Sequence, residues 1–256
     1  MAKLCPKGKA AAKRKFKVYP SAYANMYASG VCSGKITMIG KRAGEDLTSG
    51  NSNVMVGEDA GANQTDASAN VIVGQGAGEA VTTGGFNTLI GQNSGNSFDA
   101  ETHNLAVGVS ALGGSVNGGE FNVAIGNYSL DALTSADNNV ALGYEAGGAL
   151  TTAAQNVLVG AYAGGAGTMT GASNNIIGYQ AGKNIDSGHS NVLIGDDAGR
   201  NLTTANNLVM IGHNVGNGFD TETHNLAIGT DALGGSVAGG EFNVAVGNYT
   251  LDALTS

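Results

Sequence analysis

The hydrophobic pattern of this chain is one short apolar run that recurs along most of its length. Each run follows a residue that is usually Asn and ends on a Gly, as in "NVALG" at residues 139–143. The terminal glycines are spaced 17 or 18 residues apart: Gly40, Gly57, Gly74, Gly91, Gly108, Gly126, Gly143, Gly160, Gly178, Gly195, Gly212, Gly229 and Gly247. Thirteen units at a nearly constant period indicate a repeat protein.

The composition of the run predicts a strand. β-Branched residues suit a pleated strand, and a following Gly allows the positive φ angle of a tight turn. One unit then forms one coil of a parallel β-solenoid, and each coil packs on the next. We therefore predict an all-β fold, a β-roll of about thirteen 17–18-residue coils over residues 36–256, preceded by a small basic, partly helical anchor segment at residues 1–35.

The position four residues before each Gly, here called position one, holds Asn in eleven of the thirteen units. Stacked Asn side chains bond one another in ladders when identical strands lie in register. We expect such a ladder from coil to coil. Its members are Asn53, Asn70, Asn87, Asn104, Asn122, Asn139, Asn156, Asn174, Asn191, Asn225 and Asn243.

Positions two, three and four of the run are all apolar in most units. Because strand side chains alternate between two faces, positions two and four point one way and position three points the other. We expect positions two and four to fill the solenoid core and position three to face outward. An apolar column along the outside predicts a homotrimer. The predicted trimer interface is Met55, Ile72, Leu89, Leu158, Ile176, Leu193 and Met210.

A longer duplication overlies the short repeat. Residues 96–135 match residues 217–256 almost letter for letter, at an offset of 121 residues, which is a block of seven units. The last residue, Ser256, corresponds to Ser135, after which the first copy continues into another coil. We expect the natural chain to continue likewise, with further coils and a distal tip that carries receptor recognition.

Charge divides the chain into two parts. Ten of the 12 basic residues lie at or before Arg42, where no acidic residue occurs, and all 20 acidic residues follow, with only Lys183 and Arg200 among them. We expect the basic segment to be an attachment end for an acidic particle surface, and nucleic acid to be the less favoured partner. The expected anchor residues are Lys7, Lys9, Lys13, Arg14, Lys15 and Lys17.

The N-terminal sequence has no apolar core of a signal peptide, and no run of 18 apolar residues occurs in the chain. This predicts synthesis in the cytoplasm and no membrane span. Cys5 and Cys32 have no nearby His with which to complete a zinc site, so they are either two reduced thiols or one local disulfide. We expect no metal and no cofactor.

One segment carries candidate chemistry. In "FDAETH" the alternating Asp99, Glu101 and His103 would share one face if the segment were extended, and Asp220, Glu222 and His224 repeat the arrangement. Such a set could cleave a glycan or hold a cation. The alternative is a solvated loop that was copied with its block. We favour the loop and expect no catalysis, because catalytic groups need burial to perturb their pKa values.

The repeats "NVAIGNYS", "NVALGYEAG", "NLAVGVSA" and "NVLIGDDAG" resemble the Asn-x-Ala-Ile-Gly repeats of trimeric autotransporter adhesin heads. That resemblance implies a left-handed parallel β-roll in a trimer. Phage fibre and spike proteins have similar repeats, and the leader "KLCPKGKAAAKRKFKVYPSAYANMYASGVCSGKI" resembles those of virion proteins from marine phages and other large viruses. The chain lacks the secretion signal and C-terminal membrane barrel of the adhesins, which favours a phage appendage.

The resulting hypothesis is a structural protein of a phage virion, made in the host cytoplasm. It would form a trimeric fibre, docked to capsid or tail proteins by its N-terminus and projecting outward for host or surface attachment. Two alternatives remain open: a bacterial surface adhesin head and a glycan-depolymerising spike.

Overall fold

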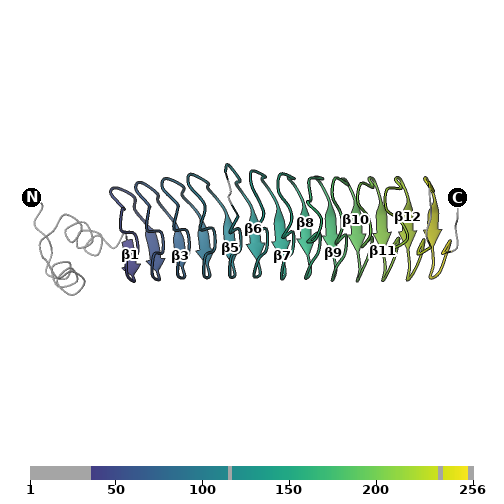
Figure 1. Ribbon diagram of the computed structural model, residues 1–256, viewed down its shortest axis with the longest axis horizontal. Helices are drawn as coiled ribbons and strands as arrows, with labels where there is room; N and C mark the ends of the chain where they lie inside the picture. Colours follow the sequence, from purple (N-terminus) through teal and green to yellow (C-terminus); the bar gives the residue numbers. More distant parts are fainter. Residues whose placement is uncertain (1–35, 115–116, 236–238, 253–256) are drawn as a thin grey trace, which may run out of the picture. The chain divides into compact units, whose positions relative to one another are not determined.

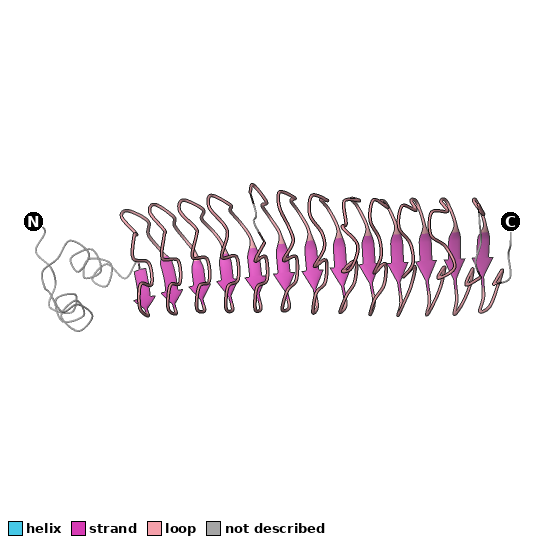
Figure 2. Cartoon of the chain, in the orientation of Figure 1, coloured by secondary structure: helices cyan, strands magenta, loops and turns pink. Residues whose placement is uncertain are grey.

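A computed structural model describes residues 36–114, 117–235 and 239–252. The expected anchor segment at residues 1–35, with its basic residues and both cysteines, lies outside the described residues. The chain divides into two compact units, one ending at Val107 and one beginning at Gly108. Within the described residues both units contain strands and turns but no helix (Figure 2).

Every strand of the described chain is three or four residues long and begins a new coil (Figure 1). The first unit contains β1 (Ile36–Ile39), β2 (Asn53–Val56), β3 (Val71–Val73), β4 (Thr88–Ile90) and β5 (Leu105–Val107). The second unit contains β6 (Val123–Ile125), β7 (Val140–Leu142), β8 (Val157–Val159), β9 (Asn175–Ile177), β10 (Val192–Ile194), β11 (Val209–Ile211), β12 (Leu226–Ile228) and β13 (Val244–Val246).

Within each unit, every strand pairs in parallel with the next strand along the chain. Met55 of β2 aligns with Ile72 of β3, and Leu193 of β10 aligns with Met210 of β11. A coil with one additional residue keeps the same register, since Leu158 of β8 aligns with Ile176 of β9. The predicted all-β parallel solenoid, with one strand in each repeat, is confirmed.

The Gly that follows each strand is required by two features of its backbone. Gly143 has a φ of 140°, which side-chain-bearing residues rarely adopt. A Cβ atom at this position would also lie 2.7 Å from the carbonyl oxygen of Gly160 in the next coil. The backbone conformation and the close stacking of the coils therefore both exclude a side chain at this position. This explains why Gly occupies it in all thirteen repeats.

The predicted facing of the strand residues is wrong. Position three is buried within the single chain, so it cannot form a surface between chains. The residues expected at the trimer interface all have 0% exposure: Met55, Ile72, Leu89, Leu158, Ile176, Leu193 and Met210. Positions two and four, which were expected in the core, are half-buried or exposed in every strand.

The physical reason is the Asn at position one. Alternation places position one and position three on the same face of the strand. The Asn side chain points inward, where it binds the backbone of the turns, and position three must therefore point inward as well. The rest of the core comes from the far side of each coil, including the small residue Ala60 and the large residues Leu47 and Phe98, all with exposures of 0–1%.

Candidate interaction surface

The Asn column forms the expected ladder, and it lies inside the solenoid. The Oδ1 atom of Asn53 accepts the backbone N–H of Asn70 at 2.9 Å, and the Nδ2 atom of Asn53 donates to the carbonyl oxygen of Ala67 at 2.7 Å. The same two bonds recur at Asn70, with Asn87 and Gly84 as its partners. Asn53 and Asn70 thus each connect their strand to the next strand and to the turn that precedes it, which makes the ladder a structural element.

The acid–acid–histidine segment does not bring its three side chains together. Asp99 is exposed and accepts a hydrogen bond from the hydroxyl of Thr82 in the previous coil. Glu101 is buried and accepts the backbone N–H of Asp99. His103 is exposed, and its ring stacks on Phe86 with the ring centroids 5.0 Å apart. The three side chains therefore do not share one face, because the segment turns sharply instead of extending.

The second copy shows why Glu is present in this turn. Glu222 is 7% exposed, and its carboxylate accepts the backbone N–H groups of Asp220, Thr221 and Gly239 at 3.0–3.1 Å. Burial alone would raise the pKa of Glu222, but these backbone bonds favour the ionised form and lower it overall. The carboxylate stabilises a turn, and His224 stacks separately on Phe242. Among the described residues, no group of three potential metal ligands occurs.

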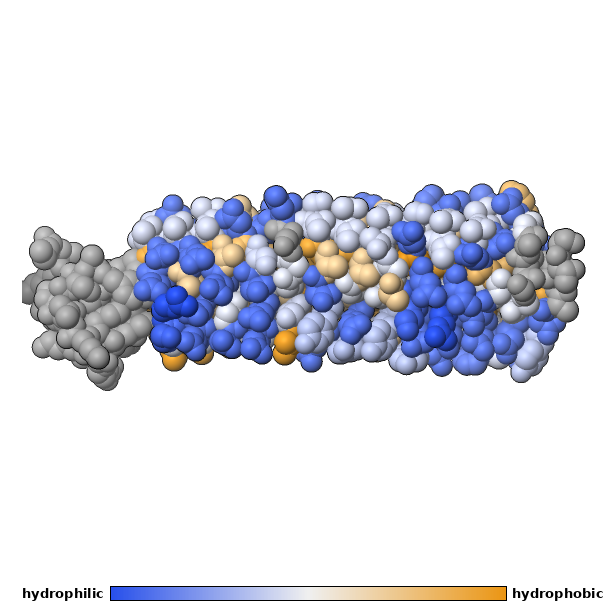
Figure 3. All heavy atoms as spheres, in the orientation of Figure 1, coloured by the Kyte–Doolittle hydropathy of each residue, from blue (hydrophilic) through white to orange (hydrophobic). Residues whose placement is uncertain are grey.

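The outward face of the strands is an apolar feature of the described surface. Positions two and four supply it, and several of their side chains are exposed: Val71, Ile90, Val140, Leu142, Ile177, Ile228, Val244 and Val246. Within positions two to four, all thirteen strands contain only uncharged residues. The view in Figure 3 shows apolar patches separated by polar residues. The two columns at positions two and four are here called the strand face.

Two ion pairs lie near the beginning of the described chain. Lys41 lies 2.8 Å from Glu58, and Arg42 lies 2.6 Å from Asp59 in the next coil. The guanidinium of Arg42 lowers the pKa of Asp59 through a hydrogen bond that outweighs the opposite effect of burial. All four residues lie in the turns after β1 and β2, where their opposite charges link neighbouring coils.

A row of tyrosines in the second unit was missed by the sequence analysis. Tyr128, Tyr144, Tyr162 and Tyr179 follow the Gly of four successive coils by one or two residues. Adjacent rings meet edge to face, with centroids 5.4–6.3 Å apart. Alignment of the repeats shows an aromatic residue at this point in each of these coils, so the signal was present in the sequence.

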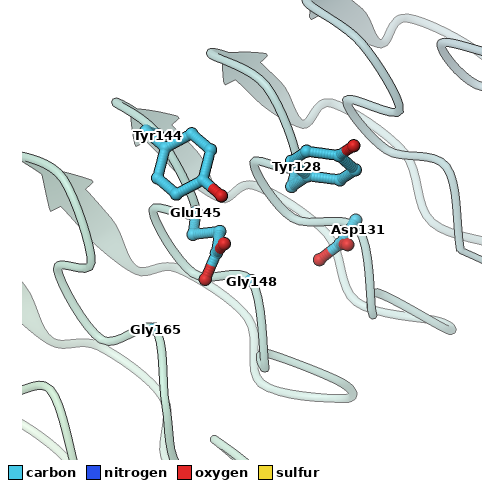
Figure 4. Close-up of a pocket in the computed structure, with 6 residues that line it drawn as sticks. All are labelled: Tyr128, Asp131, Tyr144, Glu145, Gly148 and Gly165. Atoms are coloured by element: carbon cyan, nitrogen blue, oxygen red, sulfur yellow. The ribbon is translucent and has the colours of Figure 1, made fainter.

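The first two rings border an open groove of about 470 Å³. Asp131, Glu145, Gly148 and Gly165 complete its lining (Figure 4). The hydrogen bond between Tyr144 and the Glu145 carboxylate raises the pKa of Tyr144 to about 12, so its phenol is neutral at physiological pH. The groove therefore combines two tyrosine rings with two carboxyl groups.

Comparison of the chain with protein-family models, curated proteins and solved structures finds no match. Within the described ranges, the chain forms no helix with the length and apolar character of a membrane-spanning segment.

Proposed function

We propose that this protein is a structural subunit of a self-associating fibre, in which copies of the solenoid pack through their strand faces. The observation that carries the proposal is the exposed apolar strand face. Val140 and Leu142 of β7 are 37% and 45% exposed, and Val244 and Val246 of β13 are 66% and 63% exposed. Apolar side chains that recur in every coil of a water-exposed solenoid favour a partner surface.

A second copy of the chain is the partner that best fits this surface. The partner must present apolar groups at the spacing of the coils, and another copy does so along its whole length. Charge supports the same choice, because beyond Arg42 the chain has 20 acidic and only two basic residues, yet none of them lies in the strands. The acidic surfaces of two identical solenoids would repel each other. The strand faces contain no charged residue, so they can approach without this repulsion. We propose a closed trimer, in line with the adhesin-head repeats.

The proposed assembly is an appendage of a phage-like virion. Its basic N-terminal segment would bind acidic capsid or tail proteins, and the solenoid would project the distal end toward a host or another surface. The segregation of ten basic residues at or before Arg42 supports attachment at that end. The regular ladders of backbone and Asn hydrogen bonds support a role in reach and rigidity.

Sedimentation velocity tests the self-association. The native chain is expected to sediment as a trimer, and a triple variant, Val140→Glu with Leu142→Glu and Ile177→Glu, as a folded monomer. A matched control is Thr152→Glu with Gln155→Glu and Ser187→Glu, which adds the same charge at exposed positions outside the strands. The control is expected to remain trimeric. A native chain that is monomeric at micromolar concentrations would refute the proposal.

A further inference from the structure

One ring of the tyrosine row already contacts an ammonium group, that of Lys183 in the same chain. This contact shows where a second ammonium group would lie against another ring of the row. The Nζ atom of Lys183 lies 5.3 Å from the centroid of the Tyr162 ring. At this distance the positive charge is attracted to the negative face of the ring. Lys183 is the fifth residue after its turn glycine, Gly178, and Tyr162 is the second residue after the turn glycine of the preceding coil.

The same geometric relationship recurs two coils earlier, but without the lysine. Tyr128 is the second residue after Gly126, and the fifth residue after the next turn glycine is Gly148. A Cβ atom on Gly148 would make ordinary contacts of 3.4 Å with the Tyr128 carbonyl oxygen and the Asp131 carboxylate. Gly148 therefore occupies the place of Lys183, and the absence of a side chain there leaves the Tyr128 ring facing the groove.

The groove has the chemistry of a cation site. The rings of Tyr128 and Tyr144 lie 6.1 Å apart with an interplanar angle of 85°, so they form two walls of a corner. Asp131 and Glu145 line the same space (Figure 4). Perpendicular aromatic walls with carboxylates suit a rounded cationic group, since the rings attract the charge through their faces and the carboxylates attract it directly.

We propose that the groove between Tyr128 and Tyr144 binds a small organic cation with a quaternary or methylated ammonium group. The ammonium occupies the space in front of Tyr128 that a lysine would fill at position 148. The methyl groups contact the two rings, and the carboxylates of Asp131 and Glu145 balance the charge. The site lies in the turns and not on the strand face, so it is independent of self-association.

The electrostatics of the groove favour the binding of a cation. Neither Asp131 nor Glu145 belongs to any of the four ion pairs found in the described part of the chain. Burial, together with the neighbouring charge of Glu145, raises the pKa of Asp131. A bound cation would relieve the repulsion between the two carboxylates. Binding is therefore expected to return the pKa of Asp131 toward its ordinary range.

A titration of the full-length protein with choline tests the proposal. The neutral analogue 3,3-dimethyl-1-butanol has almost the same shape and serves as the matched ligand. Binding is followed by line broadening of the ligand methyl resonance in NMR spectra. Choline is expected to bind at least about tenfold more tightly than the analogue, which is the effect of one cation–π contact in a partly desolvated site. Equal binding of both ligands, preference for a neutral monosaccharide, or no binding of choline would each overturn the proposal.

Two variants localise the binding to this groove. Gly148→Lys is expected to place the chain's own ammonium over Tyr128, as Lys183 does over Tyr162, and to abolish choline binding. Tyr128→Ala removes one wall and is expected to weaken binding about tenfold. Tyr249→Ala is the control, because Tyr249 has the same place in its coil and no described tyrosine pairs with it. Unfolding curves establish that each variant folds, and unchanged choline affinity in folded Gly148→Lys would contradict the assignment.

Discussion

Gly95 lies so close to Leu89 that a Cβ atom on Gly95 would be 2.8 Å from the Cδ2 atom of Leu89. The two residues belong to one coil: Leu89 is the buried central residue of β4, and Gly95 is four residues beyond the turn glycine. In the coil of β6 the sizes are exchanged. There the strand residue is Ala124 and the later residue is Leu130, and both are fully buried. One large side chain thus fills each of these two layers of the core.

This exchange of volume predicts a compensating pair of substitutions. Leu89→Ala is expected to destabilise the solenoid by about 2–5 kcal/mol, because it leaves a cavity. Adding Gly95→Leu is expected to recover part of that stability, because the new side chain fills the cavity. The gain is reduced by about 1–2 kcal/mol, which is the cost of a non-glycine residue at the φ of 52° of Gly95. Gly95→Leu alone should destabilise the fold by overpacking. Urea unfolding of the three variants measures the coupling, and strictly additive effects would disprove the compensation.

Gln64 places a side-chain amide without hydrogen-bond partners in the core. It is 0% exposed, and both its Oε1 and Nε2 atoms lack a partner in the described part of the chain. The matching residue in the preceding coil is Leu47, which is also buried. Gln64→Leu is therefore expected to stabilise the protein by about 1–3 kcal/mol, because the cost of burying the amide disappears. A lower midpoint of urea unfolding in this variant would contradict the prediction.

Replacing any Asn of the ladder is expected to lower the free energy of unfolding. The Oδ1 atom of Asn139 accepts the backbone N–H of Asn156 at 3.0 Å and its Nδ2 group at 3.2 Å. Asn139→Ala leaves the buried backbone N–H of Asn156 without its acceptor, so a loss of about 1–3 kcal/mol is expected. Asn184→Ala alters an exposed Asn outside the ladder and serves as the control. Thermal and urea unfolding compare the two, and equal stabilities would exclude an energetic role for the ladder.

Glu222 predicts a dependence of stability on pH. Its pKa in the folded protein is lower than the ordinary value of 4.5. The ionised carboxylate therefore stabilises the fold above pH 4.5, and this contribution is lost as the pH falls through the lower folded value. Glu222→Gln is expected to cost about 1–3 kcal/mol at pH 7, where the charge-assisted backbone bonds are lost. The difference from the native chain should shrink below pH 4.

Urea unfolding of both proteins between pH 7 and pH 3 measures this change. The control is Asp186→Asn, which neutralises an exposed carboxylate in the same unit. The control is expected to have little effect at any pH. A difference between native and Glu222→Gln proteins that stays constant across the range would show that ionisation of Glu222 does not stabilise the fold.

The sequence alone determined the period, the strand in every coil and the inter-coil Asn ladder. These features follow from local rules, since β-branched residues form the strand and Gly143 and its counterparts permit the turn. Alternation also placed Met55 on the same face of the strand as Asn53, without stating whether that face is buried. The segregation of charge at Arg42 is also visible in the sequence, although the anchor residues before it lie outside the described chain.

Only the tertiary structure decided which face of the strand is the core, because alternation distinguishes two faces without stating which one the turns enclose. It likewise showed that the side chains of Asp99 and Glu101 do not share a face, since the segment turns instead of extending. The groove between Tyr128 and Tyr144 needed the stacked coils too. Its walls belong to successive repeats, and residues 16 positions apart meet only when the backbone closes a coil and places it on the next.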